Sequence, residues 1–191
     1  MKTESEDLSA RQSLDIITTM IQQAKGKAQA NSFYFLFWGW VVALAQIGMY
    51  ILMLVNYSRP YAIWLIAVPA WIFTLYKGFR DDRSEKTAPT HFDRITTSLW
   101  LSFGIVIFTM VAFGYTINFR LNPVILTISA MPTFVSGVII RFRPLIAGGI
   151  SLWIFGVACF LLPYEIQPLM GASAIICGYL IPGYILKSRK G

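Results

Sequence analysis

Long apolar runs alternate with short charged stretches along most of the chain. Six runs lack Asp, Glu, Lys, Arg and His, and they cover residues 33–55, 61–76, 95–117, 121–140, 145–162 and 169–186. A helix rises about 1.5 Å per residue, so a run of about 20 residues crosses the ~30 Å hydrocarbon core of a bilayer. The pattern therefore predicts an all-α fold, a polytopic membrane helix bundle with six transmembrane helices in residues 32–187.

The charges between these runs predict how the bundle is oriented. If both termini are cytoplasmic, only Arg59 and Arg120 of the 16 Lys and Arg residues lie outside. This distribution follows the positive-inside rule. It also indicates that the second run crosses the membrane although it is short and contains Pro69, because a re-entrant turn would place the basic cluster at residues 77–94 outside. We therefore expect cytoplasmic N and C termini, with residues 188–191 as a cytoplasmic tail.

Prolines mark the second, fourth and sixth runs. Each of these runs has one proline at its beginning and one in its interior, namely Pro60 and Pro69, Pro123 and Pro132, and Pro168 and Pro182. An interior proline removes a hydrogen bond and bends a helix. The pattern predicts three parallel hairpins, each a straight helix followed by a bent one. A chance distribution of prolines is the competing interpretation.

Residues 1–31 are polar but carry a helical apolar stripe that includes Leu14, Ile17 and Ile21. Acidic and basic side chains balance in this segment, whereas a helix that binds anionic lipid would be basic. We expect a cytoplasmic amphipathic helix, and Leu14, Ile17 and Ile21 are its candidate face for a cytoplasmic protein partner or for the same helix of a second copy. An interfacial helix that lies beneath its own bundle is the alternative.

The composition decides which partners are expected. Hydrophobic residues make up 56% of the chain and charged residues 13%, about half the charged share of a soluble domain. The formal charge of +7 is therefore assigned to loops at a membrane surface. The expected partner is the lipid bilayer, and no nucleic acid is expected.

Polar side chains inside the runs follow helical stripes. Hydroxyl groups and small residues on one stripe favour close helix contacts in lipid, so we interpret them first as packing positions. The alternative is a polar pocket or conduit. Its candidate lining is Gln46, Ser102, Thr109, Ser129, Thr133 and Ser136.

Groups that could carry catalysis are scarce. His91 is the only histidine, and Cys159 and Cys177 lie at depths too different for a disulfide. We therefore expect no catalytic residue, no metal site and no cofactor. The sequence favours a non-enzymatic integral membrane protein, an accessory or sensor-like subunit that works through protein partners or self-association. A passive channel or small-solute carrier is the alternative, and a lipid-directed enzyme using His91, Asp93 or Glu165 is a third.

Three stretches carry a resemblance to known proteins. They are Phe37-Trp38-Gly39-Trp40, then Arg141-Phe142-Arg143-Pro144-Leu145, and finally Gly178-Tyr179-Leu180-Ile181-Pro182-Gly183-Tyr184. The chain resembles a group of small bacterial six-span membrane proteins with no assigned activity. The resemblance implies a bacterial inner membrane and supplies no functional residue.

Overall fold

The computed structural model describes residues 18, 32–84, 91–117 and 121–188. Within these ranges the chain forms helices and turns and no strand. Six helices are long and apolar enough to cross a membrane, which confirms that prediction. The expected N-terminal helix with Leu14, Ile17 and Ile21, and the last three residues of the tail, lie outside the described residues.

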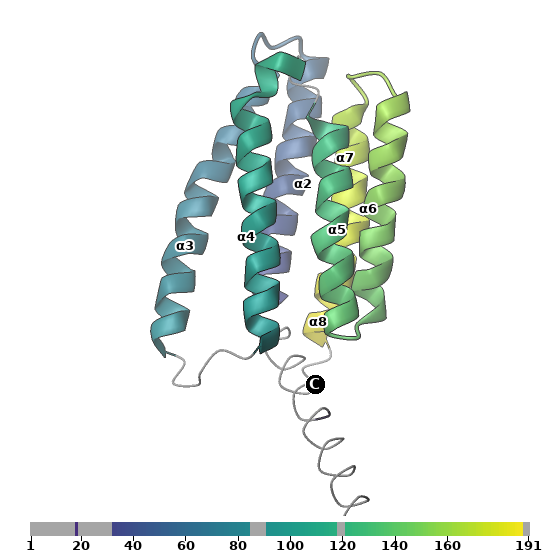
Figure 1. Ribbon diagram of the computed structural model, residues 1–191. Helices are drawn as coiled ribbons and strands as arrows, with labels where there is room; N and C mark the ends of the chain where they lie inside the picture. Colours follow the sequence, from purple (N-terminus) through teal and green to yellow (C-terminus); the bar gives the residue numbers. More distant parts are fainter. Residues whose placement is uncertain (1–17, 19–31, 85–90, 118–120, 189–191) are drawn as a thin grey trace, which may run out of the picture.

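The spans differ in their regularity (Figure 1). The single helices are α2 (Ser32–Leu54), α5 (Asn122–Ile139) and α6 (Arg143–Leu161). The second span combines the 3-10 helix η1 (Pro60–Ile66) with α3 (Ala67–Ser84), and α4 (His91–Ala112) is followed by η2 (Gly114–Ile117). The last span joins α7 (Gln167–Ile175), the π-helical segment η3 (Ile176–Leu180) and α8 (Ile181–Ser188).

Two of the interior prolines lie where the helix type changes. Pro69 is in the first turn of α3, just after the 3-10 helix, and Pro182 is in the first turn of α8, just after the π-helical segment. A proline cannot donate to the carbonyl four residues earlier, and a local change in hydrogen-bond spacing accommodates the lost donor. Pro132 instead lies inside one continuous α-helix.

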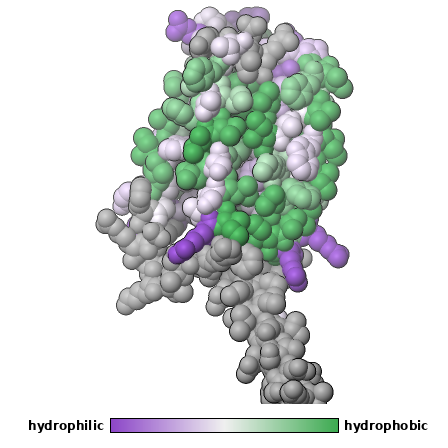
Figure 2. All heavy atoms as spheres, in the orientation of Figure 1, coloured by the Kyte–Doolittle hydropathy of each residue, from purple (hydrophilic) through white to green (hydrophobic). Residues whose placement is uncertain are grey.

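On the face shown in Figure 2, apolar side chains cover the middle of the molecule and hydrophilic side chains gather toward its ends. The exposed apolar side chains include Leu161, which is 84% exposed, and Phe108, which is 76% exposed. Large apolar groups of this kind are stable when lipid covers them, because hydrocarbon is as apolar as the side chains. The arrangement is compatible with a multi-pass membrane protein.

Four spans form the core, and two lie at its edge. The spans built on α2, α5, α6 and α7 to α8 contact one another and enclose Ala43, Leu126, Leu152 and Cys159. In the last span 56% of the membrane-spanning residues are buried, against 6% for the span of η1 and α3 and none for α4. The structure thus places α3 and α4 at the periphery, where they cover little of the core.

Glycines allow the core helices to approach closely. A Cβ atom on Gly149 of α6 would lie 2.8 Å from the Cα atom of Phe134 on α5, and one on Gly148 would lie 2.6 Å from the backbone oxygen of Gly178. Small residues at such contacts let helix backbones meet in lipid. The most extensive packing joins α5 to α6. The predicted repeat placed these two helices in different hairpins, so the grouping into three hairpins is not confirmed.

Candidate functional site

The side-chain amides of Gln46 and Asn122 meet the backbone of Gln167 near the end of the bundle where α5 and α7 begin, and these three residues are called the amide cluster. Gln46 on α2 donates through Nε2 to Oδ1 of Asn122 at 2.6 Å, and Asn122 donates through Nδ2 to the backbone oxygen of Gln167 at 2.6 Å. Gln46 and Gln167 are buried. Since lipid offers no hydrogen-bonding partner, these bonds fix the starts of α5 and α7 against α2.

The side chain of Gln167 also closes the turn between α6 and α7. Its Nε2 atom donates to the backbone oxygens of Cys159 at 3.1 Å and Leu162 at 3.2 Å, which are carbonyls left without helical partners at the end of α6. Its Oε1 atom is buried without a hydrogen-bond partner in the described part of the chain. Gly171 leaves the room that the amide of Gln46 occupies, because a Cβ there would lie 2.5 Å from Nε2.

A second polar group lies on the buried face of α5. The hydroxyl groups of Thr133 and Tyr179 share a hydrogen bond at 3.0 Å, and the Thr133 hydroxyl also bonds the backbone oxygen of Ser129 at 2.7 Å. The Ser129 hydroxyl donates to the backbone of Leu126, and Ser136 accepts a bond from Trp100 Nε1 at 3.3 Å. These hydroxyls are satisfied within the protein and link α5 to α4 and to the last span.

The remaining predicted pocket residues lie elsewhere. Ser102 and Thr109 are exposed on α4, where each donates to the backbone oxygen four residues earlier. The structure therefore brings Ser129, Thr133 and Ser136 together on α5, places Gln46 in the amide cluster, and leaves Ser102 and Thr109 on the outer surface. The predicted polar pocket or conduit stays a prediction.

Indole groups of α2 form hydrogen bonds to α3 and to α8. Trp38 donates through Nε1 to the Thr74 hydroxyl on α3 at 3.1 Å, and Trp40 donates to the Tyr184 hydroxyl on α8 at 3.0 Å. The Lys77 ammonium lies 5.2 Å from the centre of the Phe33 ring, a distance at which a cation is attracted to the ring face. Single polar contacts of this kind position α3, since little of it is buried.

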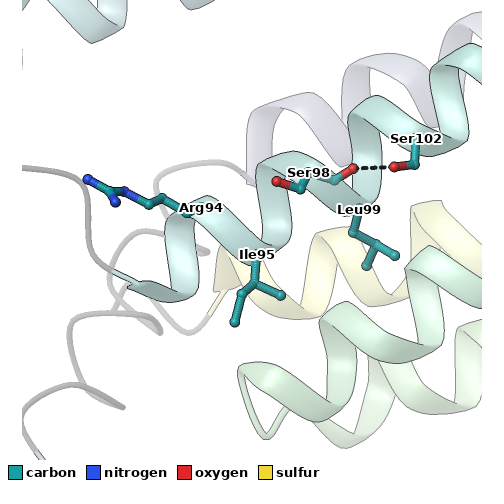
Figure 3. A pocket seen from close by; sticks show the side chains of 5 residues that line it. All are labelled: Arg94, Ile95, Ser98, Leu99 and Ser102. Carbon is teal, nitrogen blue, oxygen red and sulfur yellow. Dashed lines mark hydrogen bonds between the residues drawn. The ribbon is translucent and has the colours of Figure 1, made fainter.

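An open, nearly flat depression lies along the first turns of α4 (Figure 3), and it is called the groove here. Its lining consists of Arg94, Ile95, Ser98, Leu99 and Ser102. Arg94, Ser98 and Ser102 follow one another at four-residue intervals and form one stripe, while Ile95 and Leu99 form the neighbouring stripe. The groove therefore combines one cation, hydroxyl groups and an apolar wall.

Titratable groups near the membrane surface are dispersed. Within the parts of the chain that the structure describes, no three His, Cys, Asp or Glu side chains lie close enough together to hold a metal ion. Both cysteines are free thiols.

Burial raises the pKa of the Tyr164 phenol in the turn before α7, so this group stays neutral at physiological pH. Glu165 beside it is exposed.

The sequence interpretation found Gln46 but missed its partners. Asn122 and Gln167 each precede a proline that begins a helix, Pro123 in α5 and Pro168 in α7. An amide directly before an initial proline is a signal that could have identified both, because it places a polar side chain at the end of an apolar run. Comparison with protein-family models, with curated proteins and with solved structures found no match to the chain.

Proposed function

We propose that this chain is a non-enzymatic integral membrane protein, an accessory subunit that associates with another membrane protein or with a second copy through α3. The main support for the proposal is that few residues of this helix are buried against the rest of the bundle. Only 6% of its membrane-spanning residues are buried, and it is the least apolar of the six spans. A helix that combines these two properties gains from packing against another protein.

The physical basis is the weak drive for helix association in lipid. Because hydrocarbon is as apolar as Leu, helices associate through close packing and hydrogen bonds. The outward side chains of α3 include Trp71, Ile72 and Tyr76, which are 56%, 63% and 65% exposed. Aromatic side chains offer large, rigid contact areas to a neighbouring helix. They support an interface on this side of the bundle.

The buried polar groups favour this role over a conduit. A conduit needs polar groups that face its passage, whereas the hydroxyls of Ser129 and Thr133 bond to the helix backbone and to Tyr179. The N-terminal face of Leu14, Ile17 and Ile21 would provide a second contact to a cytoplasmic partner. That face lies outside the described residues and remains a prediction.

The proposed orientation places the basic end of the bundle in the cytoplasm of a bacterium, with the chain in its inner membrane. Arg141 and Arg143 flank the turn from α5 to α6, and Lys187 lies at the end of α8. The turn packs beside α8 through Phe142 and Leu186, so these cations lie at one end. The positive-inside rule supports a cytoplasmic location for this end.

Photocrosslinking tests the interface. A photoreactive phenylalanine analogue is introduced at Ile72 on α3 or at Ile154 on α6, which are 63% and 64% exposed and form a matched pair. The variants are expressed in the native host and irradiated in intact membranes. We expect protein adducts at position 72, whose mass identifies a partner or a second copy, and none at position 154.

Two outcomes would contradict the proposal. In the first, position 72 reacts only with lipid; in the second, positions 72 and 154 give the same protein adducts at the same yield. The first result would show that lipid alone covers α3. The second would show that the adducts report random collisions in the membrane and no interface.

A further inference from the structure

We propose that the groove on α4 binds an anionic phospholipid from the leaflet at the basic end of the bundle. This inference is independent of the α3 interface. The groove lies at the start of a helix that has none of its membrane-spanning residues buried, so its outer face is available to lipid. Its residues match the successive layers of a phospholipid, from the phosphate through the ester groups to the acyl chains.

Arg94 would bind the phosphate of the lipid. It is exposed in the first turn of α4 and forms no ion pair with a described residue. In Figure 3 its guanidinium extends away from the helix body, beyond the serines. A guanidinium binds phosphate through two parallel hydrogen bonds and stays charged at all physiological pH values. It therefore provides a directional contact that a diffuse surface charge does not.

Ser98 is the group for the ester carbonyls. It lies one helical turn after Arg94, about 6 Å deeper along the axis. The Ser102 hydroxyl donates to the backbone oxygen of Ser98 at 2.8 Å, but the Ser98 hydroxyl makes no hydrogen bond within the described ranges. Serine in a helix commonly bonds to the carbonyl one turn earlier. At this depth the exposed hydroxyl of Ser98 can instead donate to an ester oxygen of a lipid.

Ile95 and Leu99 are the groups for the first methylenes of the acyl chain. They form the apolar wall beside the serines, and the exposed surface of α4 continues with Leu101 and Ile105. A free phosphate ion would use Arg94 alone and would leave this wall unoccupied. The combination of a cation with an adjoining apolar surface therefore favours a lipid over a soluble anion.

The charge of this end favours an anionic headgroup. Arg141, Arg143 and Lys187 lie at the same end of the bundle, and cations at a membrane surface attract anionic lipids into their leaflet without binding them at a defined site. A zwitterionic lipid offers the same phosphate but brings a positive group into this field. We therefore expect phosphatidylglycerol to bind more tightly than phosphatidylcholine.

Native mass spectrometry of the full-length protein tests the site. The protein is delipidated in detergent and titrated with phosphatidylglycerol or phosphatidylcholine, and the fraction with one retained lipid is measured. Arg94→Gln is expected to weaken retention of phosphatidylglycerol about tenfold. Ser98→Ala is expected to weaken it about threefold. Arg143→Gln removes the same charge at the same end, outside the groove, and should change retention less than about twofold.

The following outcomes would contradict the proposed lipid site. Equal losses in Arg94→Gln and Arg143→Gln would show a general effect of surface charge. Equal retention of both lipids would remove the anionic selectivity. Displacement of phosphatidylglycerol from the unmodified protein by inorganic phosphate would show that the groove takes a free anion. If Arg94→Gln does not fold, the variants Ser98→Ala and Arg94→Lys replace it. Unchanged retention of phosphatidylglycerol in both of these variants would overturn the proposal.

Discussion

Asn122 accepts a hydrogen bond from Gln46 at 2.6 Å, so the first residue of α5 is joined to the second half of α2 through a buried amide pair. The same Asn122 side chain donates to the backbone of Gln167. One side chain thus connects three spans near the end of the bundle opposite the basic residues.

Asn122→Leu should therefore destabilise the bundle. The substitution removes the acceptor of the buried Gln46 Nε2 atom and one of the donors to the backbone oxygen of Gln167, which costs about 1–2 kcal/mol in a membrane setting. Thermal unfolding in detergent checks this through a lowered Tm. Thr109→Val is the control, because Thr109 is exposed and bonds only to its own helix, and it should leave the Tm nearly unchanged. Equal effects of the two substitutions would contradict the importance of the cluster.

Gly148→Ala should separate α6 from the last span. Its Cβ atom would lie 2.6 Å from the backbone oxygen of Gly178, and a backbone atom cannot move aside as a flexible side chain does. Overpacking of this kind costs about 1–3 kcal/mol. The matched control is Gly104→Ala on α4, where a Cβ meets nothing within 4 Å, and the gain in helix propensity should keep or raise stability. Chemical unfolding of both variants gives the comparison.

Cysteine labelling in intact cells should confirm the orientation. A membrane-impermeant maleimide should modify Asn56→Cys and Glu165→Cys, which lie in the turns at the less basic end. It should leave Gly78→Cys and Ser188→Cys unmodified until the membrane is opened. All four positions are exposed, so a missing reaction reports the side of the membrane and not burial.

The background for this experiment is Cys159→Ala with Cys177→Ala, since both native thiols are free. Gly78 is the most informative position because it lies near the end of the second span. A Cβ at Gly78 meets no neighbouring atom within 4 Å, so a cysteine there fits without strain. Labelling of Gly78→Cys from outside would mean that the second span does not cross the membrane.

Proteoliposomes should pass no small polar solute. The hydroxyl groups of Ser129 and Thr133 on α5 already form hydrogen bonds inside the protein. A passing solute would have to break these hydrogen bonds in turn. Stopped-flow light scattering with glycerol and urea measures the flux. Flux above that of empty liposomes, together with its loss in Thr133→Val, would support the conduit instead of the accessory role.

Much of the fold follows from the sequence because bilayer thickness and loop charge limit the possibilities. On the first span Gly39, Ala43 and Gln46 share one helix face, and all three residues are buried, as small residues at helix contacts in lipid usually are. Periodicity could not tell which hydroxyl stripes face inward. Ser102 and Thr109 bond to their own helix, so nothing requires them to be buried, and the structure leaves them exposed.

The amide cluster and the weak packing of α3 and α4 could not be predicted in the same way. Asn122 and Gln167 stand far apart in the chain and far from Gln46, and only the assembled bundle brings them together. The last span and α4 are similarly apolar, although the structure buries 56% of the last span and none of α4. Helix neighbours depend on small-residue contacts such as Gly148 with Gly178, which leave no periodic signal.

The contact between the first and last spans has a consequence for biosynthesis. Among the six spans, α2 is made before the others, and it packs most extensively against α7, which begins only at Gln167. During synthesis α2 therefore enters the membrane long before its main neighbour exists, and its small-residue face is covered by lipid or by the insertion machinery. The pair of α5 and α6 is made in succession and can dock at once. We therefore expect α5 and α6 to dock early, and α2 to complete its packing only after α7 has been made.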